Sequence, residues 1–272
     1  MSKVKKYELS RRQYISISNG NKKSYGGNQE WFPKEDAHLK DKLTHQYGCG
    51  VIAITDLFLY WAITLPNGKD TVAASYINER NTITKENYME FVQQIRDQYA
   101  FIFGSAGTFA PQLTLAINQY AKENNIQYKA ILDMDLNDLT MLNQIKQMLE
   151  NNQPIILMIG HSFPTILSRL RKKGIPFYKR TKVVDPFLTK PNEPYANYRV
   201  LKQGVFGHFV TITGIFIDDK ANTTSQDIML RISSWGVEYY VSYHHLRQYI
   251  NELSKRYLTG IISIVQIEDT AF

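Results

Sequence analysis

Apolar residues follow two different spacings along the chain, and the spacing changes near residue 153. Before this point they recur every three or four residues, which predicts helices at 49–63, 84–100, 110–125 and 136–152. After it, short β-branched and aromatic runs predict strands at 153–160, 208–217, 227–235, 238–243 and 258–267, with a short helix at 244–254. Helices that precede strands, instead of alternating with them, indicate an α+β fold.

Two segments lack such periodicity. Residues 1–40 are polar and are predicted to form an N-terminal extended segment that packs on a single domain at residues 41–272. Residues 174–206 contain several prolines and are predicted to be a long loop. Long loops in compact domains are often functional, so we expect this one to form a wall of a cleft and to influence selectivity.

Composition narrows the class of protein. Hydrophobic residues make up 43% and charged residues 21% of the chain, which favours a globular fold. One cysteine excludes an internal disulfide framework and a cysteine-rich zinc site. The net charge is +7, but the basic residues are scattered, and even the densest cluster, at 169–182, is interrupted by apolar residues. We therefore expect an ordinary solvated surface and no nucleic-acid partner.

Neither end of the chain nor its apolar runs indicate a membrane protein. The basic N-terminal stretch is not followed by the apolar core of a signal peptide. The longest apolar run, 51–65, is too short to span a bilayer and contains Asp56. We expect a cytoplasmic protein with no membrane span. No motif for a metal or a nucleotide is present, so no cofactor is expected, and the oligomeric state is left open.

The single cysteine, Cys49, lies between two glycines where an apolar helix is predicted to begin. The amides and the dipole at a helix N-terminus lower the pKa of a thiol and favour the nucleophilic thiolate. The flanking glycines leave room for a substrate backbone, and the Cys49 amide is free to face an oxyanion. A lone cysteine is also commonly a small buried apolar residue, so this segment by itself leaves both interpretations open.

Two later segments add partners for Cys49. His208 follows Gly207 and begins the predicted strand 208–217, where it could serve as a base. A Ser-Ser-Trp-Gly segment at 233–236 follows one strand later. In order and spacing, the Gly-Cys-Gly, the Gly-His strand and the Ser-Trp-Gly resemble the papain-like cysteine peptidases. The resemblance is closest to the bacterial branch that includes the double-glycine leader peptidases, and it covers residues 45–65 and 150–245.

The resemblance implies a papain-like fold, in which a helical half carries the cysteine and packs on an antiparallel sheet half. It implies hydrolysis of a peptide or protein substrate, with Cys49 as the nucleophile and His208 as the general base and acid. Ser233 falls at the position of the asparagine that orients the histidine, and Trp235 at the tryptophan that shields it. Gln46 is the candidate for the oxyanion-hole glutamine. Ser233 is a departure from the family, because a hydroxyl does not stabilise imidazolium as a carboxylate would. Gln46 is a second departure, because it precedes Cys49 by three residues, whereas the family has about six.

Other functions stay open. The chain could bind a peptide without cleaving it, with Ser233 marking lost catalysis. The same residues could also transfer an acyl group to an amine or hydrolyse a thioester.

A rival motif precedes Ser162. The segment Gly160-His161-Ser162 follows a predicted strand, as the nucleophile elbow of an α/β-hydrolase does. Phe163-Pro164 replaces the last glycine of that motif, and the helices before it do not predict a parallel sheet. The simpler interpretation is a strand-to-helix turn in which Ser162 caps the helix.

Overall fold

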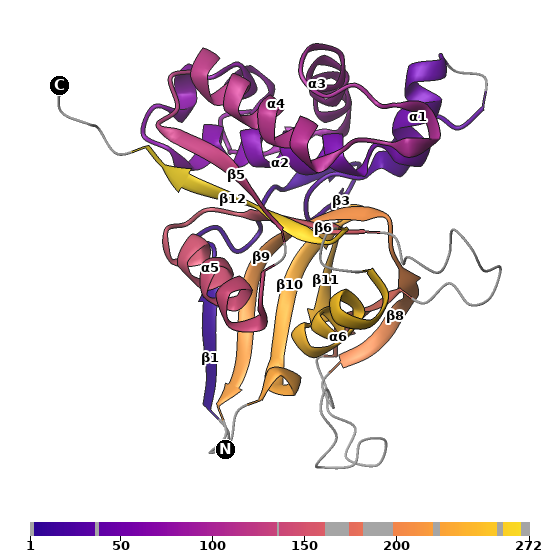
Figure 1. Ribbon diagram of the computed structural model, residues 1–272. Helices are drawn as coiled ribbons and strands as arrows, with labels where there is room; N and C mark the ends of the chain where they lie inside the picture. Colours follow the sequence, from indigo (N-terminus) through magenta and orange to yellow (C-terminus); the bar gives the residue numbers. More distant parts are fainter. Residues whose placement is uncertain are drawn as a thin grey trace.

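The computed structural model describes residues 3–35, 38–134, 136–160, 174–181, 198–219, 224–254 and 258–267. It confirms an α+β fold, in which one group of helices packs at the end of a large antiparallel sheet (Figure 1). Six α-helices lie in the described part of the chain: α1 (Leu39–Tyr47), α2 (Cys49–Thr64), α3 (Lys85–Gln98), α4 (Ala110–Glu123), α5 (Asp138–Glu150) and α6 (Tyr243–Tyr249). In Figure 1, α1 to α4 gather at the top, whereas α5 and α6 lie in front of the long strands.

The main sheet is antiparallel at every described pairing. Its strands run in the order β5 (Tyr128–Met134), β12 (Gly260–Gln266), β6 (Ile155–Ile159), β9 (His208–Asp219), β10 (Ile228–Ser234), β11 (Val237–Ser242), β7 (Ile175–Arg180) and β8 (Tyr198–Val205), and β1 (Lys3–Glu8) also pairs with β9. A small second sheet contains β3 (Lys22–Lys23), β2 (Ile17–Asn19) and β4 (Ile83–Thr84).

Strand β9 is the longest of the described strands, and it pairs with three others. Its first half, from His208 to Ile212, pairs with β6, and its second half, from Gly214 onward, pairs with β1. Strand β10 runs along its other edge. At the start of β9, His208 pairs with Ile159 of β6, and the pairing with β10 begins three residues later, at Thr211.

The hairpin between β10 and β11 turns on only two residues, Trp235 and Gly236. Both have a positive φ, +48° for Trp235 and +71° for Gly236. Two left-handed residues give the turn type whose twist matches that of the flanking strands. Glycine adopts this conformation easily, whereas a tryptophan in it is unfavourable and depends on its surroundings.

Helix α2 is the central helix of the molecule. Every residue from Gly50 to Ala62 is buried, so the helix is covered on all sides and not only on the apolar face that its spacing indicates. The Phe58 ring stacks on Tyr120 with centroids 3.7 Å apart, and Trp61 Nε1 donates to Gln153 Oε1 at 2.9 Å. The helix also packs on β9, which fixes the N-terminus of α2 relative to the sheet.

The predicted helices and late strands agree with the structure to within a few residues, but several elements were missed. Helix α1 carries few apolar residues, and β5 had no predicted counterpart. The predicted loop at 174–206 is wrong at both ends, because these are strands β7 and β8. Pro176 falls where the β7–β8 register shifts, and a proline is tolerated at such a bulge. Residues 182–197 of that segment lie outside the described residues.

The N-terminal segment packs on the rest of the chain. Strand β1 pairs with β9 over six residues. Leu9, Tyr14, Ile15, Ile17 and Phe32 are all buried in the main core.

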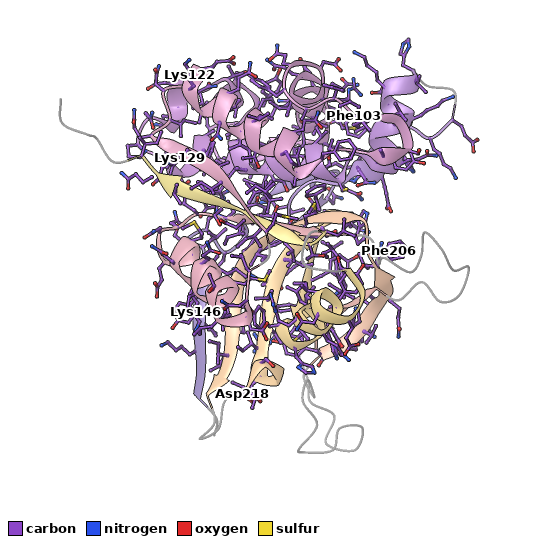
Figure 2. All side chains as sticks on the ribbon, viewed as in Figure 1. Phe103, Lys122, Lys129, Lys146, Phe206 and Asp218 are labelled. Atoms are coloured by element: carbon purple, nitrogen blue, oxygen red, sulfur yellow. The ribbon has the colours of Figure 1, made fainter. Side chains whose placement is uncertain are left out.

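Basic side chains occur on separate elements. Lys122, Lys129 and Lys146 come from α4, β5 and α5 (Figure 2).

In the described part of the chain, no single helix is both long enough and apolar enough to cross a membrane. Among the described helices, α1 and α2 reach the length and hydropathy of a membrane span only when they are counted together, and a bend of 84° separates them.

Candidate active site

Cys49 is the first residue of α2, directly after Gly48, which ends α1. The glycines beside it are required by close packing and do not leave the open space expected from the sequence. A Cβ on Gly48 would lie 2.4 Å from the Thr44 carbonyl oxygen, and a Cβ on Gly50 would lie 2.0 Å from Thr108 Oγ1. Both distances are far below van der Waals contact, so the two glycines allow α1 and the 108 segment to pack against the start of α2.

Burial raises the pKa of the Cys49 thiol, although the amides of Phe209, Gly50 and Cys49 oppose this effect. The sequence predicted a pKa lowered by the helix N-terminus. The amide donors are present as expected, but the loss of hydration outweighs them. At neutral pH Cys49 is therefore a thiol.

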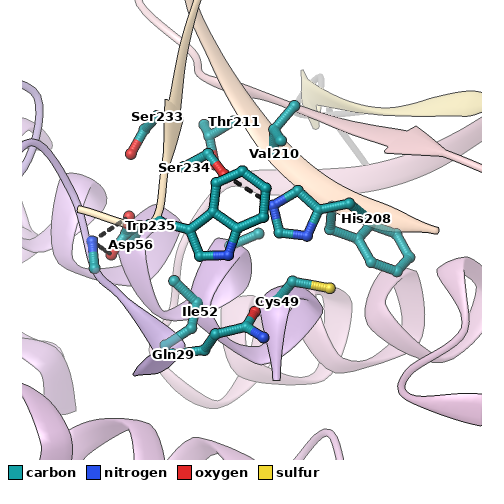
Figure 3. Close-up of a pocket in the computed structure, with 13 residues that line it drawn as sticks. Gln29, Cys49, Ile52, Asp56, His208, Val210, Thr211, Ser233, Ser234 and Trp235 are labelled. Atoms are coloured by element: carbon teal, nitrogen blue, oxygen red, sulfur yellow. Dashed lines mark hydrogen bonds between the residues drawn. The ribbon is translucent and has the colours of Figure 1, made fainter. Parts of the chain in front are cut away.

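His208 is the first residue of β9, and it is buried against β10 and the hairpin. Its Nε2 lies 2.8 Å from Ser234 Oγ. The Trp235 indole stacks on the imidazole with ring centroids 4.1 Å apart and planes 9° from parallel. Figure 3 shows Cys49 below the imidazole, on the side of the ring away from Ser234. The structure thus brings Cys49, His208 and Trp235 together, as expected.

Burial lowers the pKa of His208 to about 3, and the positive charge of Lys202 adds to this effect. The imidazole is therefore uncharged at neutral pH. With a protonated thiol on Cys49, the resting pair is neutral and is not a thiolate–imidazolium ion pair.

The hydroxyl beside His208 belongs to Ser234, so the predicted contact with Ser233 is wrong by one residue. Successive side chains of a strand point to opposite faces of its sheet. Ser234 points toward His208, whereas Ser233 Oγ donates to the carbonyl oxygen of Tyr25 at 2.8 Å. Ser233 therefore fixes the N-terminal segment near the site and does not orient the base.

The structure does not place Gln46 in the site. Gln46 is exposed on α1, and the described residues that line the pocket do not include it. A different glutamine, Gln29, lines the pocket, from a short 3₁₀-helix at Gln29–Trp31 (Figure 3). Its Nε2 donates to the His45 carbonyl oxygen at 2.9 Å, which holds the amide beside Cys49. Gln29 precedes Cys49 by 20 residues, so local spacing could not reveal it.

The pocket around these residues is small. It holds about 10 Å³ of free space between Cys49, His208, Gln29 and Trp235, which is room for about one water molecule. Among the described residues, no three His, Cys, Asp or Glu side chains gather as a potential metal site.

The Gly26–Gly27 segment, which leads into Gln29, passes tightly over Asp56 of α2. The Gly27 N–H donates to both carboxyl oxygens of Asp56, at 3.0 and 3.2 Å, and the Tyr88 hydroxyl donates to Oδ1 at 2.8 Å. A Cβ on Gly27 would lie 1.8 Å from the Tyr88 oxygen, and one on Gly26 would lie 2.1 Å from Ser233 Oγ. Asp56 and the two glycines together determine where Gln29 lies.

Asp56 is a buried carboxyl group. Burial raises its pKa to about 7, against the opposing effect of the Gly27 N–H and the Tyr88 hydroxyl. Its hydrogen bonds therefore hold a group that is largely protonated in mildly acidic solution and ionises near neutrality.

Gly27→Ala should destabilise the protein by about 1 to 3 kcal/mol, because the new methyl group overlaps the Tyr88 hydroxyl. Urea unfolding measures this loss. Gly20→Ala is the control, since Gly20 has open space and only a left-handed backbone, with a φ of +59°. A smaller loss for Gly27→Ala than for Gly20→Ala would contradict the proposed close approach.

Asp56→Asn should gain stability relative to the wild type as the pH rises from 5 to 8. The folded state holds the Asp56 proton up to about pH 7, whereas the unfolded chain releases it near pH 3.9. Between these values the folded state binds more protons, so wild-type stability falls as the pH rises, by about 2 to 3 kcal/mol over this window. Unfolding in urea at both pH values tests this, with exposed Asp70→Asn as control. An equal difference from the wild type at pH 5 and pH 8 would refute it.

The alternative nucleophile Ser162 lies outside the described residues. The strand before it, β6, is antiparallel to both of its neighbours, unlike a strand that carries an α/β-hydrolase elbow. No protein-family model matches the sequence, and no curated protein shows significant similarity to it. The functional assignment therefore depends on the geometry around Cys49 and His208.

Proposed function

We propose that the chain is a cysteine peptidase of papain-like fold that hydrolyses a peptide bond with Cys49 as the nucleophile. The observation that supports this most strongly is the position of Cys49 at the N-terminus of a buried helix, beside a histidine fixed by Ser234 and Trp235. The helical group α1–α4 and the antiparallel sheet meet at this point, as the two halves of a papain-like enzyme do.

The neutral resting pair determines the first chemical step. His208 removes the thiol proton as the Cys49 sulfur attacks the substrate carbonyl, so His208 acts as a general base instead of receiving a proton beforehand. The peptide C–N bond then breaks as His208 returns the proton to the leaving amine. Water, activated by His208, hydrolyses the resulting thioester and regenerates the thiol.

Two donors are available for the oxyanion that forms during attack. The Cys49 N–H is at the first position of α2, where amides have no partner within the helix. Gln29 donates one N–H of its amide to the His45 carbonyl, and the other N–H of the same amide is the second candidate donor. Fixed donors of this kind stabilise the charge that develops in the transition state.

Ser234 holds the imidazole less strongly than an amide or a carboxylate would. Its hydroxyl can accept from Nε2, which fixes the ring, but it supplies no negative charge to the imidazolium that forms during attack. We therefore expect a slower enzyme than a papain-like peptidase that has asparagine or aspartate at this position.

A second candidate function is peptide binding without cleavage. The raised pKa of Cys49 and the lowered pKa of His208 favour it, because both disfavour the ion pair of an activated thiol. Acyl transfer to an amine and thioester hydrolysis would use the same residues as peptide hydrolysis.

Cys49→Ala should abolish cleavage of a mixed peptide library, as followed by mass spectrometry, and leave the melting temperature nearly unchanged. Cys49 is only partly buried and its thiol is small, so its loss leaves the core intact. Cleavage by the variant at the wild-type rate would refute the peptidase. Wild-type protein that binds library peptides without cleaving them would support the binding protein.

Ser234→Ala should affect catalysis, whereas Ser233→Ala should affect stability. Loss of the Ser234 hydroxyl frees the imidazole and should lower kcat by up to about 100-fold, with little change in stability. Loss of the Ser233 hydroxyl removes its bond to Tyr25 and should destabilise the fold by about 1 kcal/mol while kcat is kept. Steady-state kinetics and urea unfolding of both variants test this, and the reverse pattern would restore Ser233 as the orienting residue.

A further inference from the structure

Lys202 of β8 contacts the tryptophan that covers the candidate base. Its Nζ lies 3.7 Å from the centroid of the Trp235 ring. His208 stacks on the same indole with centroids 4.1 Å apart and nearly parallel planes. Two groups this close to one ring cannot share a face without overlapping. Lys202 and His208 therefore lie on opposite faces of Trp235. The ammonium, the indole and the imidazole form three layers, called the Lys202 stack below.

The stack compensates an unfavourable backbone. Trp235 has a φ of +48°, which a bulky side chain adopts only when its surroundings hold it. Phe177 and Tyr239 flank the indole, at centroid distances of 5.9 and 6.2 Å. Lys202 is opposite Phe177 in the β7–β8 pairing, so one hairpin supplies both contacts. Lys202 adds a cation–π contact on the face that these two rings leave to it.

The charge on Lys202 also acts on His208 through the indole. The groups that face His208 are Cys49 from α2, Ser234 from β10, Gln29 from the 3₁₀-helix and Lys202 beyond the indole. Among the described residues that line the pocket, Asp56 is the only carboxylic acid, and its bonds go to Gly27 and Tyr88. The charge of Lys202 is thus not balanced by a carboxylate bonded to the imidazole, and it lowers the pKa of His208.

We propose that Lys202 is a positioning residue, whose ammonium group holds Trp235 against His208 and adds a positive charge that further disfavours protonation of the imidazole. The catalytic consequence depends on the proposed function, because an uncharged His208 can accept the Cys49 proton even in mildly acidic solution. The stack itself does not depend on that function and can be measured without any activity.

The titration of His208 in the Cys49→Ala protein tests the proposal. Side-chain NMR of histidine-labelled protein follows the ring, and the His208→Gln variant assigns its signal among the six histidines. The ammonium lies roughly 8 Å from the imidazole, a separation at which one charge shifts a pKa by about 0.5 to 1.5 units. Lys202→Met, which keeps the apolar stem, should raise the midpoint by this amount. Lys202→Gln should do the same and serves as the second neutral variant.

Two controls isolate the charge over the indole. Lys202→Arg keeps a cation on Trp235 and should leave the midpoint unchanged. Arg199→Met removes a cation from an exposed position of the same strand and should also leave it unchanged. An unchanged midpoint in both neutral Lys202 variants, or an equal rise in Arg199→Met, would overturn the proposal.

Kinetics separate this proposal from the peptidase assignment. If the wild type cleaves peptides, Lys202→Met should move the acid limb of kcat to higher pH and leave KM unchanged. If the variant raises the His208 titration midpoint but the wild type cleaves no peptide, the role of Lys202 is supported and only the peptidase assignment is refuted. If the wild type cleaves peptides and the acid limb of kcat is the same in Lys202→Met, the peptidase assignment stands and the role of Lys202 is refuted.

Discussion

The packing of α2 on β9 is the contact on which the site depends. The helix is buried from Gly50 to Ala62, so its axis cannot shift without opening the core. Strand β9 pairs with β6 from its first residue and with β10 from Thr211 onward. Cys49 and His208 are the first residues of these two elements, and a rigid pair of elements therefore fixes the distance between them. A site built from element ends in this way needs only short side chains to bring its reacting atoms together.

The same burial sets the chemistry of the site. Removing water raises the pKa of the Cys49 thiol and lowers that of the His208 imidazole, and both effects disfavour charge separation in the resting state. The helix amides oppose this effect at Cys49 but do not reverse it. Ser234 contributes a hydroxyl and no charge, and the positive charge of Lys202 favours the neutral ring. The net effect of these neighbours thus favours a neutral thiol and a neutral base, and in the proposed peptidase a bound substrate would have to make proton transfer favourable.

The sequence predicted those parts of the fold and site that depend on local pattern. The helices at 49–63, 84–100 and 110–125 have clear apolar spacing, and Cys49, His208 and Trp235 are marked by adjacent glycines at element ends. The sequence did not predict the features that tertiary contacts determine. Ser233 and Ser234 are equivalent in composition, and only the register of β10 determines which of them faces His208. Gln29 lies far from Cys49 in sequence and reaches the site through a segment whose path depends on Asp56. Helix α1 and strands β7 and β8 lack a clear period, and pairing within the sheet or packing on α2 determines them instead.

The buried Asp56 shows how the fold couples stability to the site. A carboxyl group in the core of α2 is unfavourable when ionised, and an apolar residue there would remove that penalty. An apolar residue, however, could not accept the Gly27 N–H, and that backbone group would be left buried without a partner as the chain turns toward Gln29. The two glycines permit the approach and the carboxyl group satisfies the backbone, so neither feature is useful without the other. The position of Gln29, the proposed oxyanion donor, therefore depends on the core around α2, and a change to Asp56 or Gly27 should displace Gln29 before it affects Cys49 or His208.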